Sequence, residues 1–400
     1  MMENKNKIFQ VTLLRHGESV GNAESRWQGQ ADYPLTERGR SQAQALAQRW
    51  KRERMKFDYI ISSPLSRARE TAEIIASKLG YVVELEPLWK MTKVPSRLAP
   101  GHGACPGCGI FPTLHQVYRV LEGDLVVLFQ TGCAMVVTTC YPATAHRINY
   151  VHNLFQNGAA TLSGLVEVYH ERVRRGELPE GRDVTFVMVS GDGGMDIGIG
   201  PALGAAHRNH SMMLLEYDNQ GYMNTGAQLS YSTPFGHRTS TSEVGSKLRG
   251  KLFHHKDTAQ IFAACHLPYV FTASEGYPED LMRKAAKAQW YARNEGLVYG
   301  KILSFCPLNW RTADDAAQPV LQAAVDSCFF PLYEVEHGKT TISYDPDATG
   351  RRVPVADWLK LMGKTRHLLS SGNAGRLAAI QTEVDRRWTR TKAMHEHPIL

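Results

Sequence analysis

The chain has 400 residues, of which 43% are hydrophobic and 21% charged, and its formal net charge is +7. This length predicts more than one domain, and the composition excludes a disordered or fibrous chain. No apolar stretch approaches the ~20 residues of a membrane helix, and the polar start does not resemble a secretory signal. We also find no run of basic residues and no nucleic-acid motif. We therefore expect a cytoplasmic protein without a membrane or nucleic-acid partner.

The first 90 residues alternate between strand and helix patterns. Strands are expected at 8–14, 57–62 and 81–85, and helices at 36–54 and 66–79. Alternation of this kind predicts a parallel sheet with crossover helices.

A Gly- and Pro-rich loop at 90–109 separates these elements from a second, larger α/β pattern. Its strands are expected at 125–129, 185–189 and 212–217, and its helices at 161–174, 199–209, 257–265 and 278–294. Two further helices are expected at 355–361 and 374–394. We therefore divide the sequence into residues 1–91, 92–345 and 346–400, the last being a C-terminal helical tail.

The seven cysteines predict metal or redox chemistry, since no export signal points to a disulfide framework. Cys105 and Cys108 form a C-x-x-C motif among glycines, and Cys133 and Cys306 supply two more thiols. A zinc site, a redox dithiol and an iron–sulfur cluster all remain possible for such residues. The other three are expected to be small core residues: Cys140, Cys265 and Cys328.

A glycine-rich turn, Gly191-Asp192-Gly193-Gly194, follows one strand pattern, and Asn219 follows the next. The backbone N–H groups of such a turn can reach a phosphate. The Asp192 carboxylate, the Asn219 side-chain oxygen and the Gly221 carbonyl are hard ligands suited to Mg²⁺. The spacing is that of the thiamine-diphosphate motif. The alternative is that Asp192 only caps the following helix.

Together, residues of about 94–345 resemble the thiamine-diphosphate-binding β subunit of the 2-oxoacid:ferredoxin oxidoreductases, such as pyruvate:ferredoxin oxidoreductase. The matching stretches are HGACPGCG, FQTGCA, VSGDGGMDIGIGPALGAAHRN, LEYDNQGYMNTGAQLSYSTP and ILSFCP. The resemblance implies a parallel sheet with helices on both faces and thiamine diphosphate bound through Mg²⁺ on Asp192, Asn219 and Gly221. It implies that Asn224 contacts the diphosphate and the substrate side of the cofactor. It also implies a 4Fe–4S cluster on four cysteines: Cys105, Cys108, Cys133 and Cys306.

The resemblance further implies oxidative decarboxylation of a 2-oxo acid to an acyl-CoA. Pyruvate is the expected substrate, and an aryl 2-oxo acid such as phenylglyoxylate is the alternative. An α subunit would supply the activating glutamate, for which this chain shows no motif. Further γ and δ electron-transfer subunits, and ferredoxin or a similar acceptor, would take the electrons. We therefore expect activity only with partner subunits. A zinc-bound, non-catalytic interaction protein is the competing interpretation.

The N-terminal segment LRHGES (residues 14–19), with PLTERGRSQA and SSPLSRARETA after it, resembles the first half of a histidine phosphatase of the phosphoglycerate-mutase-like superfamily. The resemblance implies that His16 attacks a phosphoryl group bound by Arg15, Asn22 and Arg67. The second half of that pattern brings an acidic proton donor and a second His-Gly after an apolar strand. This chain leaves the pattern at Trp89, and the nearby pair His102-Gly103 follows RLAPG rather than a strand. We therefore expect a truncated remnant or fusion that adds a partial βαβ layer without phosphatase activity. Phosphoryl transfer is the alternative function.

Overall fold

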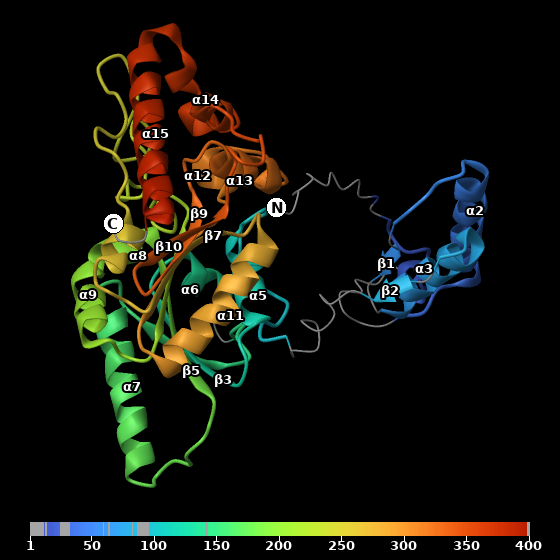
Figure 1. Ribbon diagram of the computed structural model, residues 1–400, viewed down its shortest axis with the longest axis horizontal. Helices are drawn as coiled ribbons and strands as arrows, with labels where there is room; N and C mark the ends of the chain where they lie inside the picture. Colours follow the sequence, from blue (N-terminus) through green and yellow to red (C-terminus); the bar gives the residue numbers. More distant parts are fainter. Residues whose placement is uncertain are drawn as a thin grey trace. The chain divides into compact units, whose positions relative to one another are not determined.

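A computed structural model describes residues 12, 14–24, 33–58, 60–62, 65–81, 83–85, 96–140 and 143–397 (Figure 1). The chain forms two compact units, residues 1–95 and 96–400. The strand expected at 8–14 lies almost wholly outside the described residues. The three-part division of the sequence, with boundaries at 91/92 and 345/346, stays a prediction.

The described part of the first unit holds one short and two longer helices with a short parallel pair of strands. Its elements are α1 (Val20–Ala23), α2 (Glu37–Arg52), β1 (Ile60–Ser62), α3 (Ser66–Leu79) and β2 (Val83–Leu85), with β1 and β2 parallel. Thr36 caps α2 by accepting a hydrogen bond from the Gly39 N–H, and α3 ends at Gly80, whose φ of +80° is left-handed. These local signals explain why the sequence predicted both helices closely.

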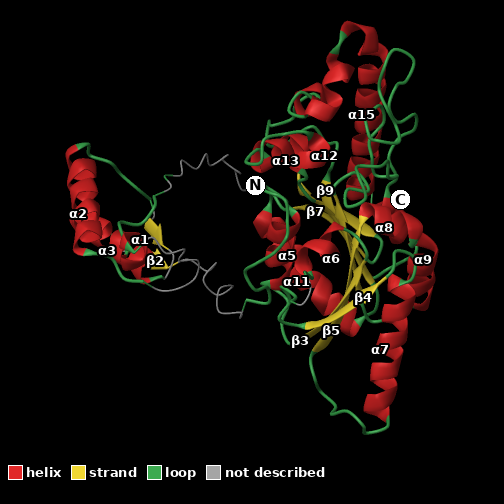
Figure 2. Cartoon of the chain, turned by 180° about the vertical axis from the view of Figure 1, so that it is seen from behind, coloured by secondary structure: helices red, strands yellow, loops and turns green. Residues whose placement is uncertain are grey.

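The second unit is built on an eight-stranded sheet. Its strands are β3 (Asp124–Gln130), β4 (Asn149–Asn153), β5 (Val184–Gly191), β6 (Met213–Asp218), β7 (Tyr269–Ser274), β8 (Val298–Leu303), β9 (Leu332–Glu336) and β10 (Lys339–Tyr344). They lie in the order β10-β9-β7-β8-β6-β5-β3-β4. Neighbouring strands are parallel except where β9 pairs antiparallel with β7 and β10 at one edge (Figure 2). The strands β4 and β7 to β10 were not predicted.

Helices cover both faces of this sheet. They are α5 (Ile110–Tyr118), α6 (Cys133–Thr138), α7 (Gly158–Arg174), α8 (Asp192–Ile197), α9 (Ile199–Arg208), α10 (Thr258–Ala263), α11 (Pro278–Asn294), α12 (Pro307–Trp310), α13 (Ala317–Asp326), α14 (Val355–Leu359) and α15 (Ala374–Glu396). Side chains alternate along each strand, so Val127 and Phe129 pack with α5 and α11, whereas Leu128 packs with α7 and α9. The predicted α/β class, with a mostly parallel sheet between helical layers, is confirmed.

The C-terminal segment belongs to the core of the second unit. Trp358 of α14 and Trp388 of α15 are fully buried in a third apolar cluster, together with Trp310. Two 3-10 turns, η1 (Gly363–Leu369) and η2 (Ser371–Asn373), join α14 to α15. Among the residues that the structure describes, none of the helices has the length and apolar character needed to cross a membrane.

Candidate functional site

Three neighbouring parallel strands bring the predicted motifs to one edge of the sheet. The strands β3, β5 and β6 are adjacent, and the residues after their carboxyl ends are Thr131 to Cys133, Asp192 and Asn219. Ligands of open α/β sheets bind at this edge. A small cavity of about 30 Å³ there has room for an ion or a water molecule. It is lined by Thr131, Gly132, Cys133, Phe155, Gly191–Gly194, Tyr217, Asn219 and Gly221–Thr225.

Polar atoms of three predicted Mg²⁺ ligands meet at this cavity. One terminal atom of the Asn219 amide lies 3.0 Å from the Gly221 carbonyl oxygen and 3.1 Å from Asp192 Oδ1. If this terminal atom is the amide nitrogen, it donates hydrogen bonds to both oxygens. If it is the amide oxygen, three oxygen atoms meet with no hydrogen-bond donor among them. The second arrangement requires a cation, and its all-oxygen donor set suits Mg²⁺.

Asp192 does not cap the helix that follows it. Gly191 is the N-cap of α8 and makes no side-chain cap, whereas Asp192 Oδ2 accepts a 2.5 Å hydrogen bond from Ser230 Oγ. Asp192 is 1% exposed. Burial, reinforced by the nearby Asp218, raises the pKa of Asp192 well above its ordinary range. A bound cation would favour the ionised carboxylate.

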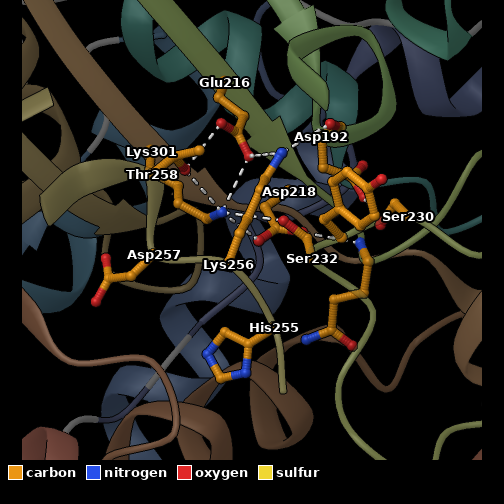
Figure 3. Close-up of polar contacts among 12 residues, drawn as sticks. Asp192, Glu216, Asp218, Ser230, Ser232, His255, Lys256, Asp257, Thr258 and Lys301 are labelled. Atoms are coloured by element: carbon orange, nitrogen blue, oxygen red, sulfur yellow. Dashed lines mark hydrogen bonds and ion pairs between the residues drawn. The ribbon is translucent and has the colours of Figure 1, made fainter. Parts of the chain in front are cut away.

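A chain of buried opposite charges supports this carboxylate (Figure 3). Lys256 Nζ donates to the Asp192 backbone oxygen at 3.0 Å and forms ion pairs with Asp196 and Glu216. Lys301 Nζ lies 3.0 Å from a carboxylate oxygen of both Glu216 and Asp218. The ion pairs therefore connect the helix that begins at Asp192 to the strand that ends before Asn219.

Two lysines outweigh the effect of burial on the Glu216 carboxyl group. Burial alone would raise the pKa of Glu216, but Lys256 and Lys301 outweigh it and lower that pKa to about 2. Burial lowers the pKa of Lys301, whereas Asp218 and Glu216 reverse this effect and raise it above its ordinary value. The sequence analysis missed this network, although one signal was present: Glu216 and Lys301 each interrupt an otherwise apolar strand.

The glycine-rich turn lies under the loop that carries Asn224. A Cβ added at Gly193 would lie 2.4 Å from the ring of Tyr222, so only glycine allows this loop to pack so closely. The loop exposes Asn224 at the mouth of the cavity. Asn224 therefore lies beside the other predicted cofactor residues, and its contact with a cofactor stays a prediction.

The four predicted cluster cysteines lie near one another. A backbone hydrogen bond of 2.9 Å from Gly109 N to Phe305 O joins the C-x-x-C loop to the loop of Cys306. Burial raises the pKa of Cys133 to about 12, and the negative charges of Cys306, Cys108 and Cys105 add to this shift. The Cys133 thiol is therefore within electrostatic range of the other three.

The thiols nevertheless do not surround a single point. In the described part of the chain, no three His, Cys, Asp or Glu side chains form a group that could hold one metal ion. Four cysteines can instead bind the separate iron atoms of a 4Fe–4S cluster, which keeps their sulfur atoms apart. A 4Fe–4S cluster on these four thiolates stays a prediction.

A buried carboxylate, which the sequence analysis also missed, connects two of the cysteine loops. Glu275 accepts hydrogen bonds from the Phe305 N–H at 2.9 Å and from Thr113 Oγ1 at 2.7 Å. Phe305 precedes Cys306, and Thr113 lies in the first turns of the helix after Cys108. Burial raises the pKa of Glu275 to about 7 despite these bonds.

The three remaining cysteines do not all behave as predicted. Cys328 is buried, Cys265 is partly exposed and Cys140 is exposed. The expectation that Cys140 is a core residue is wrong, because Cys140 lies beyond the end of the short helix α6 and is exposed.

The first unit brings together part of its predicted site. Arg67 Nε donates to His16 Nε2 at 3.2 Å, and Thr71 Oγ1 accepts from the adjacent Gly17 N–H. Arg15 is exposed, and Asn22 caps its own short helix through the Ser19 backbone N–H. The nearby His-Gly pair of the sequence lies in the second unit. Its His102 stacks on Phe111 and lies in a loop, not after a strand.

A larger cavity of about 550 Å³ lies at the opposite end of the second unit's sheet. It is lined by residues at the amino end of β5 and the C-terminal part of α11, including Thr185, Trp290 and Arg293. None of the predicted site residues contributes to it.

Comparisons with known families agree with the geometry of both units. Residues 131–299 match the family model described as "Thiamine pyrophosphate enzyme, C-terminal TPP binding domain", which spans the cavity residues. Residues 11–90 match the model of the histidine phosphatase superfamily (branch 1). The second unit therefore contains a region similar to thiamine-diphosphate-binding domains, and the first unit is similar to histidine phosphatases.

Curated relatives define the family more narrowly. The pyruvate synthase subunit PorB of Methanocaldococcus jannaschii is 40% identical over 272 residues, which cover 68% of this chain and 89% of the relative. The ketoisovalerate oxidoreductase subunit VorB of Pyrococcus horikoshii is 33% identical over 298 residues, 74% of this chain and 92% of the relative. The chain belongs to this family of 2-oxoacid:ferredoxin oxidoreductase β subunits.

A solved structure shows a more distant likeness. The 2-oxoglutarate:ferredoxin oxidoreductase from Magnetococcus marinus is 23% identical, with a TM-score of 0.43, over 56% of this chain and 69% of that chain.

Proposed function

We propose that this chain is the β subunit of a CoA-acylating oxidoreductase that decarboxylates a 2-oxo acid, with pyruvate as the substrate. It binds thiamine diphosphate through Mg²⁺ and carries a 4Fe–4S cluster. The convergence of Asn219, Gly221 and Asp192 on one point supports this proposal most strongly. When bound, thiamine diphosphate supplies the carbanion chemistry of decarboxylation.

The described residues would hold the cofactor by contributing fixed oxygen ligands. Mg²⁺ would be bound by Asp192, Asn219 and the Gly221 carbonyl. Asp192 is held in place by Ser230, which donates to its carboxylate, and by Lys256, which donates to its backbone oxygen. Because these groups are buried and already bonded, they need little rearrangement when the ion arrives.

The cluster would lie on four thiolates: Cys105, Cys108, Cys133 and Cys306. Cys133 also lines the cavity beside Asp192 and Asn219, so this thiol belongs to both proposed sites. A cluster this close to the cofactor is suited to accept its electrons one at a time.

The partners follow from what this chain does not provide. We propose an α subunit that supplies the activating glutamate, γ and δ electron-transfer subunits, coenzyme A, and ferredoxin or a similar acceptor. The names of the relatives include both pyruvate and ketoisovalerate enzymes. Phenylglyoxylate is kept as the alternative substrate, and turnover assays with the three 2-oxo acids decide among them.

Calorimetric titration tests the cofactor site. Thiamine diphosphate and Mg²⁺ are titrated into the full chain assembled with its partner subunits. The Asp192→Asn variant removes the anionic ligand and keeps the side-chain size, so we expect affinity to fall at least ~100-fold. Asn219→Ala should weaken binding as well.

Asp183→Asn is the matched control, because Asp183 lies just before the same strand, β5, at the opposite end of the sheet, and its side chain is 77% exposed. It should keep cofactor affinity close to that of the wild type, because the length of β5 separates it from Asp192. Unchanged affinity in Asp192→Asn and Asn219→Ala would overturn the site.

We propose no role for the first unit in the oxidoreductase reaction. Its Arg67–His16 hydrogen bond is compatible with an anion site, but its family match ends at residue 90. Phosphate release from phosphomonoesters that is lost in His16→Ala would instead establish the alternative function, phosphoryl transfer.

A further inference from the structure

A lysine from the C-terminal segment lies beneath the proposed metal site. Lys364 is in η1, is 2% exposed, and its Nζ donates a 2.9 Å hydrogen bond to Gln220 Oε1. Its ammonium also lies 5.5 Å from the centre of the Trp310 ring. Trp310 Nε1 in turn donates to the Asn219 carbonyl oxygen at 3.1 Å. Lys364 therefore contacts the residue that separates two proposed Mg²⁺ ligands, Asn219 and Gly221.

The environment of Lys364 is unusual for a buried cation. Among the described residues, no carboxylate forms an ion pair with Lys364, whose hydrogen-bond acceptor is the neutral Gln220 amide. A buried ammonium without an ion-pair partner is costly to retain. Burial lowers the pKa of Lys364 to about 7, although the charges of Cys306, Asp218 and Asp192 act in the opposite direction. A methionine of similar volume would avoid this cost, so a contribution to fold stability alone does not explain the lysine.

Gln220 is strained at the place where the lysine holds it. Its φ of +66° is left-handed, a conformation that glycine adopts freely and that glutamine rarely adopts. Gln220 is 1% exposed and is fixed at three points: its N–H donates to Asp218, its carbonyl accepts from Thr233, and its side chain accepts from Lys364. Strain maintained by so many contacts is typical of functional sites.

The strained residue determines where its neighbours point. A left-handed residue after a strand turns the chain sharply, and this turn brings the Gly221 carbonyl within 3.0 Å of the Asn219 amide. If Gln220 relaxed to a negative φ, the two ligands would no longer face the same point.

We propose that Lys364 is a positioning residue, which holds Gln220 in the left-handed conformation and thereby directs Asn219 and Gly221 toward the Mg²⁺ of thiamine diphosphate. The C-terminal segment thus supports the cofactor site that lies far from it in the sequence. This inference rests on the proposed function.

The experiment measures Mg²⁺ affinity at saturating thiamine diphosphate in the full chain assembled with its partner subunits. Lys364→Met should weaken Mg²⁺ binding 10- to 100-fold, the usual loss when a group behind a metal ligand is removed. Gln220→Gly should retain affinity within a few-fold of the wild type, because glycine adopts the left-handed conformation without strain.

The double variant is decisive. With a glycine in place of Gln220, the turn is no longer strained and the lysine has nothing to hold. Lys364→Met combined with Gln220→Gly should therefore return most of the lost affinity. A structural role in folding would instead make the two losses add. Lys360→Met, which removes an exposed lysine one turn earlier in the chain, is the control and should bind Mg²⁺ as the wild type does.

The Mg²⁺ affinities of the single and double variants decide whether Lys364 positions Gln220. Unchanged affinity in Lys364→Met, or a double variant as weak as that single variant, overturns it. If Lys364→Met does not fold, a double variant that folds and binds Mg²⁺ tightly supports it, and one that does not overturns it. Failure of the wild type to bind Mg²⁺ with thiamine diphosphate would contradict the proposed function itself.

Discussion

The two units present functional motifs in different settings. In the first unit, His16 accepts a hydrogen bond from Arg67, and the N–H of Gly17 donates to Thr71. These contacts join segments about fifty residues apart. In the second unit, Asp192 is held by Ser230 and Lys256, and Gln220 by Lys364, which is 144 residues away. The described contacts of the second site therefore span up to 144 residues of sequence, and those of the first span about fifty.

This difference shows why a sequence motif alone is weak evidence for activity. Both units retain recognisable motifs, and both match a family model. In the second unit, buried groups hold Asp192 and the residue between Asn219 and Gly221 in place. We therefore expect substitutions of residues that support the second site to lower stability or cofactor affinity. A substitution in the first unit should leave the oxidoreductase reaction unaffected.

The largest expected effect is at the cysteines. Cys108→Ala removes a proposed cluster thiolate, so the purified protein should lose its absorbance near ~400 nm and its iron. Iron analysis and visible spectroscopy of anaerobically purified protein make the measurement. Cys265→Ala, at a cysteine that packs against a different apolar cluster from Cys108 and Cys133, is the control and should retain both. Full iron content in Cys108→Ala would refute the cluster assignment.

Breaking the charge network should cost stability. Lys301→Met leaves Glu216 and Asp218 buried without their 3.0 Å partner, which we expect to destabilise the second unit by about 3–5 kcal/mol. Calorimetric melting of the full chain measures the change, with the exposed Lys339→Met as control. A melting temperature equal to that of the wild type would show that the network contributes nothing.

Acid should weaken the same network. Glu216 has its pKa lowered to about 2 from an ordinary 4.5, so its contribution is complete above pH 4.5 and is lost as the pH falls toward 2. In Glu216→Gln this part of the acid dependence should be absent, and stability should decline less steeply below pH 4.5. Melting temperatures measured across this range provide the test, and parallel profiles would contradict the assignment.

The smallest effect is expected in the first unit. His16→Ala should leave 2-oxoacid turnover, iron content and thiamine diphosphate affinity at wild-type values, because none of the proposed ligands lies in that unit. A loss of turnover in His16→Ala would show that the two units are functionally coupled, against this account.

Local signals in the sequence were sufficient for much of the fold. The helices α3 and α11 were predicted to the residue, because Gly80 ends the first and Pro278 begins the second. The apolar runs of β5 and β6 likewise marked buried parallel strands. The strands β4 and β7 to β10 escaped prediction, although β9 and β10 pair as close neighbours in the sequence.

Part of the candidate site could likewise be predicted from local sequence signals, and part could not. Asp192, Asn219 and Gly221 were predicted from their positions at strand ends, and the structure brings them together. The supporting residues Lys256 and Lys364 had no such signal, because their partners lie 64 and 144 residues away. Exposure of Cys140 was also missed, since composition alone does not reveal where a short helix ends.

Direct observation of the metal tests the central claim most sharply. A crystal structure of the assembled enzyme with thiamine diphosphate and Mn²⁺ in place of Mg²⁺ would locate the ion by its anomalous signal. The account predicts one peak at about 2.1 Å from an Asp192 carboxylate oxygen, the Asn219 side-chain oxygen and the Gly221 carbonyl oxygen. A peak bound by other residues, or cofactor bound without an ion at these three oxygens, would contradict it.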